Sequence, residues 1–131
     1  MIPEKIDHLC IAVKDLKASE KKWTKLMGKE PVLRYVDEKE KIDVVRYSIG
    51  ESFIEIMTAT DEESPVGKFL KKRGEGLYLI SFKVNDSEGV LRELEGLGIK
   101  LIDKNLRKWR ESSYFFLHPE ETNGVLLEII D

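Results

Sequence analysis

Three ionisable side chains stand in the middle of short apolar segments, where charged residues are uncommon. His8 lies in IDHLCIAV, Glu55 in FIEIM and Glu128 in LLEII. A buried charge is costly unless it is paired, hydrogen-bonded or bound to a metal ion. One imidazole nitrogen and two carboxylate oxygens form a suitable ligand set for a divalent ion such as zinc, cobalt, manganese or nickel. We therefore predict that His8, Glu55 and Glu128 line one metal site.

Each of these residues also has a simpler structural interpretation. A glutamate in the middle of a strand can face solvent, and a single histidine is more often a hydrogen-bonded core residue than a ligand. Glu55 and Glu128 lie at equivalent places in the two halves of the chain, and His8 also lies in the middle of a strand. Together these positions favour glutamates that point into a polar cavity over glutamates that face solvent. Cys10 shares the alternating face of His8. It could be a soft metal ligand or a reactive thiol, although a buried and inert cysteine is the favoured interpretation.

The elements that position these residues follow from hydrophobic periodicity and from turn residues. Residues 6–16 begin as a strand that carries His8 on its smaller, more polar face. Asp15 is a suitable N-cap for a short amphipathic helix that ends at Gly28. Three strand-like runs follow, at residues 30–36, 43–49 and 52–57. The first half of the chain is therefore predicted to follow the order βαβββ.

The second half of the chain repeats this order after a short helix over residues 65–73. A helix capped by Asp86 follows the first of four predicted strands, which lie at residues 77–84, 99–103, 112–117 and 125–130. Order and turn residues match between the halves, although their sequences are not obviously identical. We predict a single domain made of two βαβββ modules, about residues 1–62 and 75–131, joined by the short helix.

The second module lacks a counterpart of His8. Matching the first strands of the modules at Val13 and Val84 places Leu79 at the position of His8. Leucine cannot bind a metal ion, and the side chain of neighbouring Tyr78 points to the other face of the strand. The predicted site therefore has three of the four ligands that two matching modules would supply.

Composition and charge exclude several classes of protein. The 131-residue chain is 41% hydrophobic and 36% charged, with no low-complexity tract, which indicates a folded domain. Its net charge is −3 and its basic residues are scattered, so we do not expect nucleic acid as a partner. The single cysteine suits a reducing compartment, and the sequence contains neither a signal peptide nor an apolar run of membrane-spanning length. We predict a cytoplasmic protein without a membrane partner.

Four segments, which together cover nearly the whole chain, resemble one protein family. They are IDHLCIAVKDL, SPVGKFLKKRGEGL, GIKLIDKNLR and FFLHPEETNGVLLEII. They resemble the vicinal oxygen chelate superfamily of glyoxalase, bleomycin resistance protein and extradiol dioxygenase, and most closely its methylmalonyl-CoA epimerases. The resemblance implies an α+β, glyoxalase-like fold, in which tandem βαβββ modules form a curled mixed sheet around a cup with one metal ion. It also implies a homodimer, and it assigns the ligand positions to His8, Glu55, Leu79 and Glu128.

The resemblance further implies a metal-dependent isomerase or lyase that acts on a small carboxylic acid or an acyl-CoA through an enolate. Glu128 matches the position that is both ligand and base, and Glu55 is the other carboxylate assigned to catalysis. The family's second base falls at Val45, which cannot carry a proton. The segment from Arg107 to Arg110 replaces a glycine-rich loop of the family. It could cover the cup or bind a phosphate, and a solvated loop is the simpler expectation.

Two other functions stay open at the level of sequence. The first is a metal-free module that keeps the cup to sequester a small molecule, as the resistance-protein branch of the superfamily does, and Leu79 favours it. The second is a structural subunit whose glutamates face solvent. The structural subunit is the less favoured of the two, because glutamates that face solvent need not lie at strand positions that match that of His8.

Overall fold

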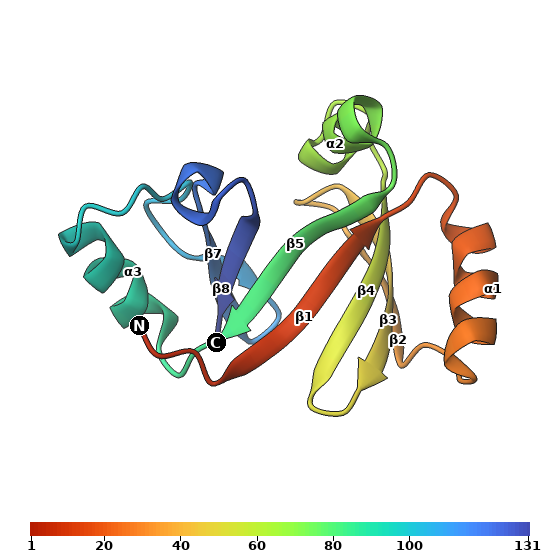
Figure 1. Cartoon of the computed structure of the whole chain (residues 1–131), viewed down its shortest axis with the longest axis horizontal. Helices are drawn as coiled ribbons and strands as arrows, with labels where there is room; N and C mark the ends of the chain where they lie inside the picture. Colours follow the sequence, from red (N-terminus) through yellow and green to blue (C-terminus); the bar gives the residue numbers. More distant parts are fainter. The chain divides into compact units, whose positions relative to one another are not determined.

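The structure is a computed structural model that describes residues 1–131 (Figure 1). The first series of elements comprises β1 (Lys5–Ala12), α1 (Leu16–Met27), β2 (Leu33–Asp37), β3 (Ile42–Ile49) and β4 (Ser52–Ala59). Helix α2 (Pro65–Arg73) precedes the second series, which comprises β5 (Gly76–Lys83), α3 (Ser87–Gly96), β6 (Arg107–Trp109), β7 (Ser112–Leu117), a short 3-10 helix η1 (Pro119–Thr122) and β8 (Leu126–Ile130). The predicted repeat of βαβββ is therefore confirmed. None of the α-helices combines the length and the apolar character that crossing a membrane requires.

The eight strands are hydrogen-bonded in the order β2-β3-β4-β1-β5-β8-β7-β6. The chain forms two compact units, one of residues Leu9–Tyr78 and the other of Met1–His8 together with Leu79–Asp131. Strands β1 and β5 each continue from one unit into the other, so the first strand of each series contributes residues to both units. The division into modules at about residues 1–62 and 75–131 stays a prediction.

In the unit Leu9–Tyr78, helix α1 covers one face of the antiparallel strands β2, β3 and β4. The helix begins where the Asp15 carboxylate accepts a hydrogen bond from the Ala18 N–H, and it ends at Gly28, whose φ of 70° suits glycine. Apolar residues of the helix and of the neighbouring strands pack around a buried cluster of Val13, Val45, Tyr47 and Ile56. The α1 side of these strands is thus the hydrophobic core, and polar side chains gather on the other side.

In the other unit, helix α3 packs against strands β7 and β8 around a second apolar core. The core consists of Val84, Leu91, Leu94, Phe115, Leu117, Leu127 and Ile129. Asp86 caps the helix by accepting the Gly89 N–H at 3.0 Å. The Asp131 carboxylate accepts the N–H and hydroxyl of Ser87 and the N–H of Ser113, and so ties the start of α3 to β7. Glu128 lies on the face of β8 away from this core.

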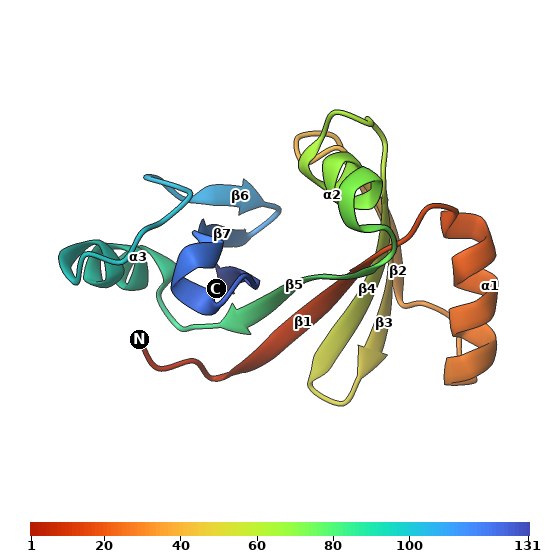
Figure 2. The same ribbon diagram turned by 45° about the horizontal axis from the view of Figure 1, so that its top comes forward.

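The predicted strand at residues 99–103 is wrong, because only an isolated bridge between Leu101 and Leu117 forms there. The Asp103 carboxylate accepts the Phe116 N–H at 3.0 Å, where a continuing strand would offer a backbone carbonyl. The strand forms later, as β6, which pairs with β7 in antiparallel register (Figure 2). The expectation of a solvated loop from Arg107 to Arg110 is therefore also wrong for its first three residues.

Candidate active site

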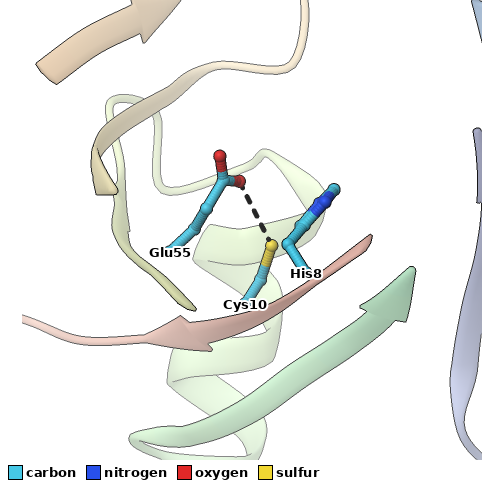
Figure 3. A group of neighbouring side chains, drawn as sticks. All are labelled: His8, Cys10 and Glu55. Carbon is cyan, nitrogen blue, oxygen red and sulfur yellow. Dashed lines mark hydrogen bonds between the residues drawn. The ribbon is translucent and has the colours of Figure 1, made fainter. Parts of the chain in front are cut away.

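Glu55 is held by donors from three other strands. Its residue is 4% exposed, and strand β4 carries it on the face away from α1. The Tyr35 hydroxyl of β2 donates to Oε2 at 2.9 Å, and the Cys10 thiol of β1 donates to Oε1 at 3.5 Å (Figure 3). The Arg46 guanidinium, directly opposite Glu55 on β3, lies 3.7 Å from Oε2. These contacts fix the orientation of the carboxylate.

Tyr35 acts in this group as a neutral donor. Burial, followed by the negative charge of Glu55, raises the pKa of Tyr35 far above its ordinary value of 10.0. The phenol therefore keeps its proton and continues to donate it to Glu55. Arg46 supplies the positive charge, and its guanidinium also stacks on the Phe53 ring, 3.8 Å from the centroid.

The position expected for a second base does not face Glu55. Val45 pairs with Ile56, and both belong to the apolar core on the α1 side. Since side chains alternate along a strand, the neighbours of Val45 that share the face of Glu55 are Val44 and Arg46. Neither is a carboxylate, so β3 provides no second base beside Glu55.

Glu128 is paired with a serine and with the predicted histidine ligand. It is 6% exposed, and it lies opposite Ser81 in the parallel pairing of β5 with β8. The Ser81 hydroxyl donates to Oε1 at 2.7 Å, and Nε2 of His8 lies 3.4 Å from the same oxygen. The other ring nitrogen of His8, Nδ1, is 2.8 Å from the Asp7 carboxylate. His8 and Glu128 thus lie side by side within one unit, and their role as metal ligands stays a prediction.

Leu79, which the resemblance assigns to a ligand position, is a buried residue of β5. The residue is 4% exposed and lies on the same face of β5 as Ser81, two residues earlier. Matching the modules as before, Cys10 and Ser81 occupy corresponding positions, two residues beyond His8 and Leu79. Each donates a hydrogen bond to the glutamate in the last strand of its own series. In both series, a side chain of the first strand therefore donates a hydrogen bond to the buried glutamate of the last strand. The series differ two residues earlier, where one has His8 and the other Leu79.

The His8 and Glu128 pair fits the requirements of a divalent ion. With its proton on Nδ1 and directed to Asp7, His8 presents Nε2 as the metal-binding nitrogen, which is the usual arrangement of a metal-bound histidine. Two ligands at about 2.1 Å from a tetrahedral ion are about 3.4 Å apart. The distance between His8 Nε2 and Glu128 Oε1 is 3.4 Å. The donor types and this spacing both suit zinc or a similar ion.

A basic side chain lies on the Glu128 face of the same unit. Phe116 pairs with Glu128 across β7 and β8, so both project to one side. The Arg107 guanidinium lies 4.7 Å from the centroid of the Phe116 ring and 2.9 Å from Asp103 Oδ1. Asp103 therefore neutralises much of the charge of Arg107, which does not stand as an isolated anion-binding residue.

Sequence reasoning missed four residues of the site: Asp7, Tyr35, Arg46 and Ser81. Ser81 could have been found, because it is a polar residue on the same strand face as Leu79 and corresponds to Cys10. Asp7 could have been found as a carboxylate next to the histidine. Tyr35 and Arg46 depend on the register of β2, β3 and β4, which periodicity alone does not specify.

The sequence profile of the Glyoxalase/Bleomycin resistance protein/Dioxygenase superfamily matches residues 7–116. This match covers most of the chain, from β1 into β7. The protein belongs to this superfamily, and the glyoxalase-like α+β fold that the resemblance implies is confirmed.

Individual relatives point to one activity within the superfamily. An uncharacterized protein of Bacillus subtilis is 30% identical over 128 residues, which are 97% of this chain and 91% of that protein. An ethylmalonyl-CoA/methylmalonyl-CoA epimerase of Cereibacter sphaeroides is 26% identical over 95% of this chain and 96% of its own. A methylmalonyl-CoA epimerase variant of Streptomyces coelicolor, solved with 2-nitronate-propionyl-CoA, superposes with a TM-score of 0.93 at 29% identity, covering 98% and 94% of the two chains. This likeness to isomerases supports the expectation that the protein is an enzyme.

Proposed function

We propose that the protein is a metal-dependent isomerase of the methylmalonyl-CoA epimerase type, which acts on an acyl-CoA or another small carboxylic acid through an enolate. The pairing of His8 Nε2 with the buried carboxylate of Glu128, with Asp7 on the other ring nitrogen, carries the proposal. The likeness to epimerases, one of them solved with an acyl-CoA analogue, supports this substrate class.

His8, Glu55 and Glu128 are the residues that would hold the metal ion, which we expect to be zinc, cobalt, manganese or nickel. A bound divalent ion would polarise the carbonyl oxygens of the substrate and stabilise the negative charge of the enolate. Asp7 lies against Nδ1 of His8 and orients the ring, as carboxylates next to the second ring nitrogen of metal-bound histidines do. Ser81 does the same for the carboxylate of Glu128.

Glu128 is the group that we assign to proton transfer. Its carboxylate removes the α-proton, so that the C–H bond breaks, an O–H bond forms and the electron pair passes into the enolate. Ser81 donates to Oε1 and so fixes the plane of the carboxylate towards the substrate. Glu55 has a different role, because Tyr35 and Arg46 keep its carboxylate occupied as an acceptor. We assign Glu55 to binding and to electrostatic stabilisation in catalysis.

The absence of a second carboxylate beside Glu55 bears on the stereochemistry. An epimerase must exchange protons on both faces of the α-carbon, whereas a lyase needs only one base. Incubation of methylmalonyl-CoA of one configuration in D2O distinguishes these outcomes by mass spectrometry and by chiral analysis. Deuterium incorporation with inversion supports the epimerase, loss of a substituent supports a lyase, and no incorporation with no product contradicts both.

The metal requirement can be tested on protein purified without chelator. We expect elemental analysis to find about one divalent ion per chain, and Glu128→Gln to abolish deuterium exchange at the α-carbon. Glu38→Gln is the matched control, because Glu38 is exposed on the turn after β2. An absence of bound metal, with no activity gained on adding zinc or cobalt, would count decisively against the proposal.

A metal-free binding module is the second candidate, and two observations favour it. Leu79 is buried where a ligand is expected, and Arg46 already offsets the charge of Glu55 without a metal ion. Leu79→His separates the two functions, since it supplies the imidazole that the second module lacks. If metal affinity appears only in this variant, the natural protein is a metal-free binder. If the native protein already binds tightly, the metal-dependent enzyme is favoured.

A further inference from the structure

The buried Cys10 thiol is the feature that the proposed function does not use. The residue is 1% exposed, and no disulfide partner exists in a chain with one cysteine. It lies on β1 two residues after His8, so the two side chains project from the same face of one strand (Figure 3). A potential soft ligand therefore stands beside the predicted imidazole ligand, in a chain that lacks a ligand at Leu79.

The spacing of Cys10 from Glu55 suits two ligands of one ion. Their Sγ and Oε1 atoms are 3.5 Å apart, and both residues are buried. A tetrahedral zinc ion with bonds of about 2.3 Å to sulfur and about 2.1 Å to oxygen would separate these atoms by about 3.6 Å. The corresponding pair in the other series, Ser81 and Glu128, is separated by 2.7 Å, which is an ordinary O–H···O hydrogen bond. The 3.5 Å between Cys10 Sγ and Glu55 Oε1 is the length of a thiol hydrogen bond and also suits adjacent ligands, so an ion could replace the thiol proton with little movement of either side chain.

The side chains of His8, Cys10 and Glu55 offer a nitrogen, a sulfur and a carboxylate oxygen. We propose that Cys10 is a further ligand of the metal ion, beside His8 and Glu55. This inference rests on the proposed metal site and adds to it a donor from β1. On coordination, the S–H bond of Cys10 breaks, an S–metal bond forms and the proton is released to solvent.

A thiolate ligand changes which ions the site prefers. Soft sulfur donors select zinc and cobalt over manganese and magnesium, whereas a site made only of nitrogen and oxygen discriminates less. We expect zinc and cobalt to bind at least about 10-fold more tightly than manganese. In Cys10→Ser this preference should shrink, because the hydroxyl is a hard and weak donor.

Cobalt provides a direct test, because a cobalt ion bound to a thiolate has a sulfur-to-metal charge-transfer absorption in the near ultraviolet. We expect the metal-free native protein to develop this band with a stoichiometry of one cobalt per chain. Cys10→Ser and Cys10→Ala should lack the band and should bind cobalt at least about 10-fold more weakly by calorimetry, since even the loss of a residue that only supports a ligand lowers metal affinity by about 10–100-fold. The double variant Cys10→Ala/Leu79→His should bind cobalt without the band, which also demonstrates that the fold tolerates the loss of the thiol.

The outcomes separate this inference from the proposed function. Cobalt binding with the charge-transfer band in the native protein, lost in Cys10→Ser, supports the thiolate ligand. Cobalt binding without the band overturns the role of Cys10 and leaves the metal site of His8, Glu55 and Glu128 standing. No cobalt binding in the native protein, with binding in the double variant, overturns both.

Discussion

Removal of the Ser81 hydroxyl tests how Glu128 is held in its buried position. The Ser81 residue has no exposed surface, and its Oγ lies 2.7 Å from Glu128 Oε1. A hydrogen bond to a charged group contributes about 1.5–3 kcal/mol, and its loss leaves a buried carboxylate with one donor fewer. We therefore expect Ser81→Ala to lower the free energy of unfolding of the metal-free protein by about 2 kcal/mol. In a chain of this size, that change corresponds to a fall in Tm of roughly 6–10 °C.

The measurement is urea denaturation in the presence of a chelator, so that a bound metal ion does not mask the loss. Ser81→Cys is the matched variant, because the other series of elements uses a cysteine at the corresponding position to donate to Glu55. A thiol is a weaker donor than a hydroxyl, so we expect Ser81→Cys to fall between the native protein and Ser81→Ala. A loss below about 0.5 kcal/mol in Ser81→Ala, which is typical of a surface substitution, would refute the reasoning.

Three further predictions concern stability and assembly. Burial opposes ionisation of Asp131, but hydrogen bonds from Ser87 and Ser113 outweigh it and lower the pKa of Asp131 below 3.8. The pKa of Asp131 is lower in the folded than in the unfolded protein, so its ionised form stabilises the fold above about pH 4. This stabilisation is lost as the pH falls through the folded pKa. In acid denaturation measurements, the native protein should therefore lose its stability advantage over Asp131→Asn as the pH falls. Asp103→Ala should destabilise the protein by about 1–2 kcal/mol and speed amide exchange at Phe116, whose N–H the carboxylate accepts; unchanged exchange at Phe116 would contradict this. The homodimer implied by the family resemblance predicts a mass twice the 15.2 kDa of the chain in light scattering.

The elements that local sequence signals specify are the ones that sequence reasoning predicts well. Asp15 and Asp86 both cap their helices as expected, since a carboxylate followed by an amphipathic stretch satisfies the first N–H groups of a helix. Gly28 ends α1 in the left-handed conformation that favours glycine. The strands at residues 43–49 and 112–117 are found within one residue of the predicted bounds. All of these signals act over a few neighbouring residues.

The parts that sequence reasoning misses depend on contacts between distant segments. The predicted strand at residues 99–103 does not continue through Asp103, because the carboxylate of Asp103 accepts the N–H of Phe116 in place of a backbone carbonyl. The side chain of Val45, the position assigned to the second base, lies in the apolar core on the face opposite to Glu55, and the register that places it there is not marked in the local sequence. The partnership of Arg46 with Glu55 follows from the register of two strands, and no local pattern marks it.

The two predicted glutamates occupy corresponding positions but have different surroundings, and this difference decides their roles. Glu55 faces the guanidinium of Arg46 together with two hydrogen-bond donors, the Tyr35 hydroxyl and the Cys10 thiol. The neighbours of Glu128 include the Ser81 hydroxyl and the imidazole of His8. A carboxylate whose oxygens already accept from several donors and lie beside a guanidinium is suited to binding and to electrostatic stabilisation. The fold provides two carboxylates at corresponding positions, and the pairing of Glu55 with Arg46 is the reason why we propose Glu128 as the acceptor of the α-proton.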